Sequence, residues 1–88
     1  MPHNNQAKKR LRQDDVRRIR SRSIRREIKT LTKRFAAHVE DRERDEAVET
    51  FRTIVSKLDK AAKRRVYHKN TVARRKSHAA RLLSTIEG

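Results

Sequence analysis

The chain has 88 residues and a formal charge of +15, with 42% charged and 33% hydrophobic residues. A chain of this length forms one small domain with a modest core, and so large a positive excess opposes compaction unless an anionic partner neutralises it. The absence of cysteine excludes disulfides and Cys-based zinc sites, and no apolar run approaches the ~20 residues that span a bilayer.

The distribution of residue types predicts an all-α protein. Gly88 and Pro2 are the only glycine and proline, so nothing between them breaks a helix. β-Branched and aromatic residues do not alternate with polar ones, whereas helix-favouring Arg, Lys, Ala, Glu and Leu dominate. We therefore expect a single domain, 1–88, in which a flexible tail at residues 1–6 precedes helices at about 6–41, 44–65 and 68–86.

The first expected helix carries an apolar stripe only in its C-terminal half. The stripe repeats every three to four residues and consists of Ile24, Ile28, Leu31, Phe35 and Val39. Continued toward the N-terminus, the same side of the helix meets Arg17, Asp14 and Leu11, two of which are charged. We therefore expect a three-helix bundle whose first helix, roughly 50 Å long, extends several turns beyond the bundle with no protein core beneath it.

The N-terminal half of this helix is strongly basic. Residues 7–26 contain ten Lys or Arg but only two acids, Asp14 and Asp15. A charge run is most often a solvated, salt-bridged helical face, but two acids cannot pair ten cations, so the segment favours polyanion binding. Arg outnumbers Lys by eight to two, which favours phosphate because a guanidinium donates two parallel hydrogen bonds. The segment lacks the wide apolar face of a membrane-surface helix.

An acidic stretch, Glu40 to Glu46, separates the first two helices and suits a turn. The acids at its end fall at the start of the second helix, where the helix dipole favours them, and Lys63, Arg64 and Arg65 would close that helix with the preferred sign. The second apolar stripe consists of Ala47/Val48, Phe51, Ile54/Val55, Leu58 and Ala61/Ala62. We expect both phenylalanines, which lie on the stripes, to be in the core.

The third helix combines an apolar stripe with a basic cluster. The stripe consists of Val72/Ala73, Ala80, Leu83 and Ile86, with Val66 and Tyr67 leading into it. Arg74, Ser77 and Arg81 are spaced to share the opposite face, and His78 and Lys69 add donors. Because a hairpin-like fold would bring this cluster to the same side as the basic N-terminal segment, we interpret it as a binding surface.

Several other kinds of site are not expected. None of the four histidines has an i, i+3 or i, i+4 histidine partner, so we expect no metal and no other cofactor. The sequence offers no nucleophile–base set and no glycine-rich phosphate loop, and we expect no enzyme activity and no small-molecule substrate. With both phenylalanines in the core, no aromatic platform remains for stacking single-stranded bases. Recognition should therefore be of duplex-rich nucleic acid through its backbone.

Three segments of the sequence resemble a known family. They read AKKRLRQ…RRIR, IKTLTKRF and HKNTVARRKS, and the match is colinear from about Ala7 to Leu83. In this order they resemble the bacterial small-subunit ribosomal protein S20 family, and the decapeptide beginning at His68 is the most specific part. The resemblance implies a three-helix bundle with an extended first helix.

The resemblance also implies a function and a set of contacts. It implies a cytoplasmic, ribosomal protein that binds small-subunit ribosomal RNA directly, in the 5′ region near the base of the body, and helps assembly by neutralising and bridging RNA helices. Other ribosomal proteins would be peripheral partners, and neither a membrane nor a second copy of the chain would be involved. By position, the implied RNA-binding residues are Lys8, Lys9, Arg10, Arg12, Arg17, Arg18, Arg20, Arg22, His68, Lys69, Asn70, Arg74, Arg75, Lys76 and Ser77.

Two features depart from the family pattern. Arg42 and Arg65 stand in the two turns where the family usually has glycine. We therefore expect longer turns, or helices that continue for one or two further residues. Asp14 and Asp15 also dilute the basic block, which weakens the assignment of contacts beside them.

Two alternative functions remain open from the sequence. A dimeric DNA-binding regulator would need an apolar seam of four or more heptads continuous with its basic region. The first stripe is shorter than that, and two further stripes of matching length can pack on it within the same chain. A nucleoid-type protein that binds any duplex would have a similar charge.

Overall fold

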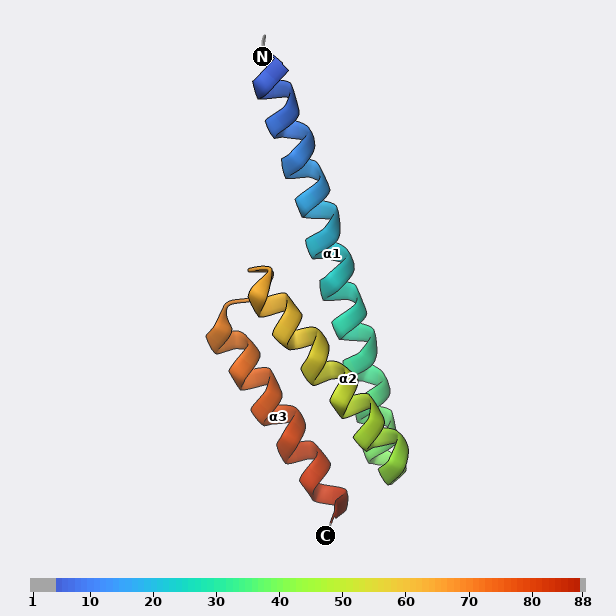
Figure 1. Ribbon diagram of the computed structural model, residues 1–88. Helices are drawn as coiled ribbons and strands as arrows, with labels where there is room; N and C mark the ends of the chain where they lie inside the picture. Colours follow the sequence, from blue (N-terminus) through green and yellow to red (C-terminus); the bar gives the residue numbers. More distant parts are fainter. Residues whose placement is uncertain (1–4, 88) are drawn as a thin grey trace.

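The computed structural model describes residues 5–87, which form three α-helices: α1 (Asn5–Glu40), α2 (Arg44–Lys63) and α3 (Lys69–Glu87) (Figure 1). The expected all-α bundle with a long first helix is confirmed. Of the tail expected at residues 1–6, residues 1–4 lie outside the described part of the chain, and Asn5 and Gln6 belong to α1.

The core lies where the apolar stripes of the three helices meet. α2 packs extensively against both neighbours, whereas α1 and α3 contact each other less. Phe35, Ile28 and Leu58 are the largest side chains that are fully buried, and Phe51 is half-buried beside Phe35, with the two ring centroids 6.1 Å apart. Within residues 6–86, no polar or charged side chain is buried, so packing of apolar groups is the main source of stability.

Part of the apolar stripe of α3 is shifted by one residue from the expected stripe. Val72, Ala79 and Leu83 are buried, whereas Ala73 and Ala80 are exposed. The buried positions are separated by seven and four residues, which is the spacing of one helical face. The expectation that Ala73 and Ala80 face the core is therefore wrong, because each lies about 100° around the helix from its buried neighbour.

The N-terminal half of α1 extends beyond the bundle, as expected. Figure 1 shows it clear of both α2 and α3, and the molecule measures 62 × 21 × 16 Å. Residues 8–20 are all exposed, including the apolar Leu11, Val16 and Ile19, of which 52%, 47% and 67% remain accessible. We call residues 5–22 of α1 the rod; its residues 8–20 are all exposed.

The α1–α2 turn is closed by an arginine with a left-handed backbone. Arg42 has φ 54°, and its N–H donates to the Val39 carbonyl at 3.1 Å. The next N–H, of Glu43, donates to the His38 carbonyl at 2.8 Å. These two bonds define a Schellman motif, which normally has glycine at the left-handed position because glycine has no Cβ to clash with the backbone.

The α2–α3 turn repeats this geometry. Arg65 has φ 58°, its N–H donates to the Ala62 carbonyl at 3.1 Å, and the N–H of Val66 donates to the Ala61 carbonyl at 2.9 Å. α2 consequently ends at Lys63, two residues before the expected end at 65. The expectation that arginine would lengthen the turns or the helices is wrong, because arginine adopts the backbone conformation that glycine would have adopted.

Glycine at the left-handed position of either turn should therefore stabilise the folded protein. We expect Arg42→Gly and Arg65→Gly each to raise the free energy of unfolding by about 1 kcal/mol. A left-handed non-glycine residue costs roughly 1–2 kcal/mol, part of which is offset by the greater freedom of glycine in the unfolded chain. Urea unfolding followed by circular dichroism would measure the change. Arg52→Gly, within α2, is the control and should destabilise by about 1 kcal/mol; destabilisation in all three variants would contradict the expectation.

Candidate nucleic-acid interface

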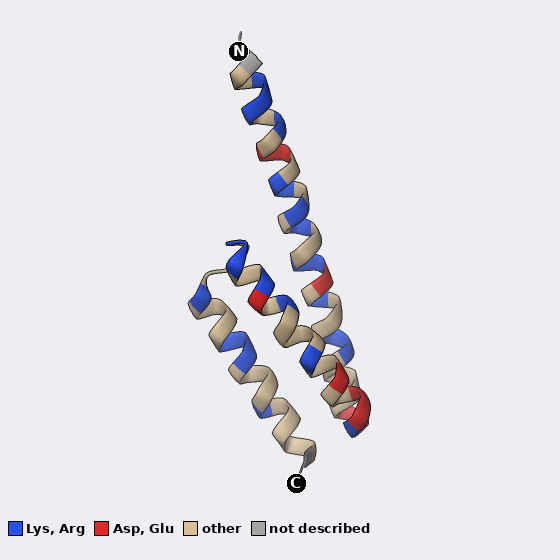
Figure 2. Ribbon diagram, in the orientation of Figure 1, with Lys and Arg blue, Asp and Glu red and all other residues tan. Residues whose placement is uncertain are grey.

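Charge is segregated along the molecule. Figure 2 shows acidic residues gathered at the α1–α2 turn, whereas Lys and Arg follow the rod and gather again at the α2–α3 turn. The acids at the first turn are Glu40, Asp41, Glu43, Asp45 and Glu46. The rod-forming half of α1 and the α2–α3 turn, both basic, therefore lie away from the acidic α1–α2 turn.

The rod presents its cations without acidic partners. Within residues 6–86, the ion pairs join His38 to Glu43, Lys57 to Glu27 and Lys76 to Asp59, and none involves a cation of the rod. One side of the rod forms a shallow groove of about 330 Å³, lined by Lys9, Arg12, Gln13, Val16, Arg17 and Arg20. A row of unpaired cations on an exposed helix is suited to neutralising a chain of phosphates.

The rod meets the α2–α3 turn in a second basic groove. Its volume is about 850 Å³, and it is lined by Arg17, Arg20, Ser21 and Ile24 of α1 and by Arg64, Arg65 and Val66 of the turn. Four guanidinium groups from distant parts of the sequence therefore line one groove. Sequence reasoning assigned Arg64 and Arg65 only to closing α2; their place here depends on the turn, which folds back beside α1.

His68 begins α3 with a capping interaction. The Asn70 N–H donates to His68 Nδ1 at 3.1 Å, and the Val72 N–H donates to the His68 carbonyl at 3.1 Å. His68 thus occupies the N-capping position of α3. Since an amide can only donate, Nδ1 must be unprotonated in this arrangement. The side chains of His68, Lys69 and Asn70 are exposed and remain candidates for RNA contact.

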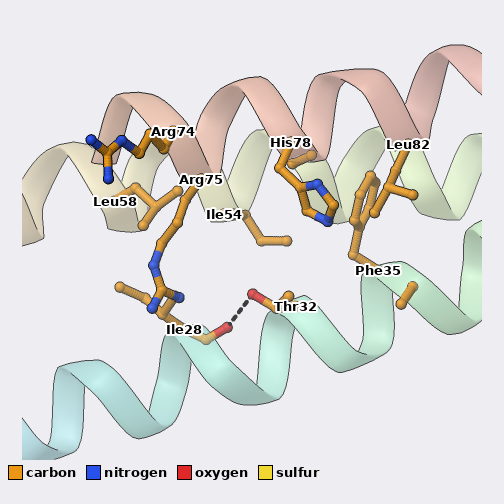
Figure 3. Close-up of a pocket in the computed structure, with 11 residues that line it drawn as sticks. Ile28, Thr32, Phe35, Ile54, Leu58, Arg74, Arg75, His78 and Leu82 are labelled. Atoms are coloured by element: carbon orange, nitrogen blue, oxygen red, sulfur yellow. Dashed lines mark hydrogen bonds between the residues drawn. The ribbon is translucent and has the colours of Figure 1, made fainter. Parts of the chain in front are cut away.

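The three consecutive cations of α3 point in different directions, because a helix turns by about 100° per residue. Figure 3 shows Arg75 extending from α3 toward α1 beside Ile28, with Arg74 directed away. Lys76 is half-buried and pairs with Asp59 of α2. Arg74, Arg75, Ser77 and Arg81 are all exposed, whereas Lys76 is drawn toward α2, so the cations of the basic decapeptide do not all face one way.

Three further observations on the described residues concern an apolar hollow, metal-ligand residues and helix hydropathy. A hollow of about 330 Å³ between α1 and α3 is mainly apolar, and its His78 has no carboxylate partner in residues 6–86 (Figure 3). In the same residues no group of three or more His, Cys, Asp or Glu could hold a metal ion. None of the described helices is long and apolar enough to cross a membrane.

Comparison with known proteins gives consistent matches over nearly the whole chain. The family model described as Ribosomal protein S20 matches residues 2–84. The chain is 43% identical over 83 residues to small ribosomal subunit protein bS20 of Borreliella burgdorferi (strain ZS7), covering 94% of this chain and 98% of the relative. It is 43% identical over 79 residues to bS20 of Kocuria rhizophila, with 90% and 92% covered, and 38% identical over 80 residues to bS20 of Clostridium beijerinckii, with 91% and 92% covered.

Proposed function

Because this chain belongs to the ribosomal protein S20 family, we propose that it is a structural component of the small ribosomal subunit that binds ribosomal RNA directly. The RNA site is in the 5′ region, near the base of the subunit body. The protein acts in the cytoplasm, needs no cofactor and has no enzyme activity. Its contacts with other ribosomal proteins are peripheral.

The observation that carries this proposal is the rod. Residues 8–20 are exposed throughout and contain seven Lys or Arg that form no ion pair within residues 6–86. A helix with no protein core beneath it gains little stability from its own chain, since most helical stability comes from packing. RNA phosphates on either side would both neutralise the cations of the rod and stabilise its helix. An RNA partner therefore explains why α1 extends beyond the bundle.

Neutralisation also explains how the protein would help assembly. An α-helix with its side chains is about 10–12 Å wide, so a helix with cations around its circumference can lie between two RNA backbones and reduce their mutual repulsion. The bundle fixes where the rod begins and carries the second set of cations. The residues proposed to contact RNA are Lys8, Lys9, Arg10, Arg12, Arg17, Arg18, Arg20, Arg22, His68, Lys69, Asn70, Arg74, Arg75, Lys76 and Ser77, joined by Arg64 and Arg65 from the groove.

A basic DNA-binding dimer has less support. Its coiled coil would need a long apolar seam, but the buried part of the stripe of α1 is already covered by α2 and α3. Leu11, Val16 and Ile19 on the rod are separated by five and three residues, which does not make a heptad seam. A nucleoid-type protein would bind any duplex with similar affinity, whereas a ribosomal protein would prefer ribosomal RNA, and this difference can be measured.

A competition experiment tests the proposal. The protein is titrated with small-subunit ribosomal RNA in the presence of duplex DNA of equal length, at about 0.15 M salt, where binding by charge alone is weak. We expect a preference for the ribosomal RNA of at least roughly 1,000-fold, the lower end of the usual ratio of specific to non-specific binding. Equal affinity for both nucleic acids would refute the ribosomal assignment and favour the nucleoid-type alternative.

A further inference from the structure

A third basic groove lies between α1 and α3, on the bundle itself. Its volume is about 570 Å³, and its lining includes six cations: Arg22, Arg25, Arg26, Lys29 and Lys33 of α1, and Arg75 of α3. Thr32 and Tyr67 complete the lining, which contains no acid. We call this cavity the α1–α3 groove. The nearest acid in the sequence of α1, Glu27, pairs instead with Lys57 of α2 at 2.9 Å.

Two of these guanidinium groups are held in place by one tyrosine. The Arg75 Cζ atom lies 4.7 Å from the centroid of the Tyr67 ring, and the Arg25 Cζ atom lies 5.9 Å from it. Arg25 also donates from Nη2 to the Val66 carbonyl at 3.5 Å. The electron-rich face of an aromatic ring attracts cations within about 6 Å, so Tyr67 draws together two like charges that would otherwise separate.

Holding cations together without an anion is unfavourable in the free protein, because their mutual repulsion opposes it. The same arrangement favours an anion that fits between them, since the side chains are already positioned and lose little further freedom on binding. Figure 3 shows Arg75 reaching across toward α1, so a ligand in the groove would contact both helices.

We propose that the α1–α3 groove binds backbone phosphates of the ribosomal RNA, with Arg25 and Arg75 as forked donors. Tyr67 acts as a positioning residue for the two guanidinium groups and does not stack on a base. This inference rests on the proposed function and adds Arg25, Arg26, Lys29 and Lys33 to the RNA-binding surface. The groove lies on the bundle, so its contacts, except those of Arg22, are additional to those of the rod.

The test compares two double variants of equal charge change. Arg25→Gln/Arg75→Gln alters the groove, and Arg44→Gln/Arg52→Gln removes two exposed cations of α2 that do not line it. Affinity for small-subunit ribosomal RNA is measured at several salt concentrations, with a circular dichroism melt of each protein. We expect the groove variant to bind at least about tenfold more weakly and its salt slope to fall by about 2, whereas the control stays within roughly threefold of the unaltered protein.

Two variants of Tyr67 separate positioning from charge. Tyr67→Leu removes the ring without changing the net charge, and we expect it to weaken RNA binding several-fold with little change in the number of counterions released. Tyr67→Phe keeps the ring and should bind like the unaltered protein. This pair remains informative if the double arginine variant fails to fold.

The outcomes distinguish the two levels of the proposal. If the unaltered protein prefers ribosomal RNA but the groove and control variants bind equally well, the groove inference is overturned and the proposed function stands. A groove variant with a lower melting temperature but an unchanged salt slope would also overturn it, because the arginines would then serve the fold alone. If the unaltered protein shows no preference for ribosomal RNA, the proposed function fails and the assigned ligand of the groove fails with it.

Discussion

Phe35→Ala is expected to lower the free energy of unfolding by about 3–5 kcal/mol, the usual cost of removing a fully buried phenylalanine ring. Phe35 is 1% exposed and lies in the core between the helices, beside the half-buried Phe51. Alanine would leave a cavity that three rigid helices can fill only in part. In a chain of this size the loss corresponds to a fall in melting temperature of at least about 12 °C, measurable by circular dichroism.

Two controls make this result specific to the core. Phe51→Ala removes the same atoms from a half-buried site and should cost clearly less. Leu11→Ala removes a large apolar side chain from the rod, where Leu11 is 52% exposed, and should change stability by less than about 0.5 kcal/mol. A loss for Leu11→Ala comparable with that of Phe35→Ala would mean that the rod has a protein partner, contrary to the structure.

The largest effect on binding is expected from the rod. Replacing its four groove-lining cations by glutamine should lower affinity for ribosomal RNA at least about 100-fold near 0.15 M salt, because each removed phosphate contact reduces both attraction and counterion release. The slope of log affinity against log salt should fall by about 3. The substitutions are Lys9→Gln, Arg12→Gln, Arg17→Gln and Arg20→Gln. Filter binding at four or more salt concentrations gives both quantities.

A matched variant distinguishes position from total charge. Arg44→Gln, Arg52→Gln, Lys60→Gln and Lys63→Gln remove the same charge from exposed positions on α2. We expect this protein to lose much less affinity, because only long-range attraction is reduced. Equal losses in the two variants would show that net charge governs binding and that the rod has no special role.

The three helices and the rod could be predicted from the sequence because both depend on local patterns. Apolar residues every three to four positions identify the faces that must be buried, and the end of that pattern before Ile24 identifies the part of α1 that leaves the bundle. The pattern was ambiguous where two apolar residues are adjacent. Ala79 and Ala80 have equal hydrophobicity, and only packing against α2 determines which of them is buried.

The turns and the detailed site could not be predicted in the same way. The left-handed Arg42 and Arg65 depend on paired backbone hydrogen bonds, which favour this conformation even without glycine. Similarly, the Lys76–Asp59 pair and the position of Arg75 beside Tyr67 depend on how α3 packs against its neighbours. Part of the α1–α3 groove could be predicted from the sequence, because the spacing of Arg22, Arg26, Lys29 and Lys33 places them on one helical face. The sequence did not show that Tyr67 and Arg75 lie opposite that face and complete the groove.

The uncovered rod also affects the lifetime of the protein outside the ribosome. Trypsin-like proteases cleave after Lys and Arg, and residues 7–26 offer ten such bonds. Most of these bonds lie in the exposed part of α1, where packing against the rest of the described chain does not stabilise the helix. Docked RNA would shield these bonds, so we expect chains that have not bound RNA to be cleaved faster in this segment than chains that have. The shape of α1 would thereby match the amount of protein to the amount of RNA available to receive it.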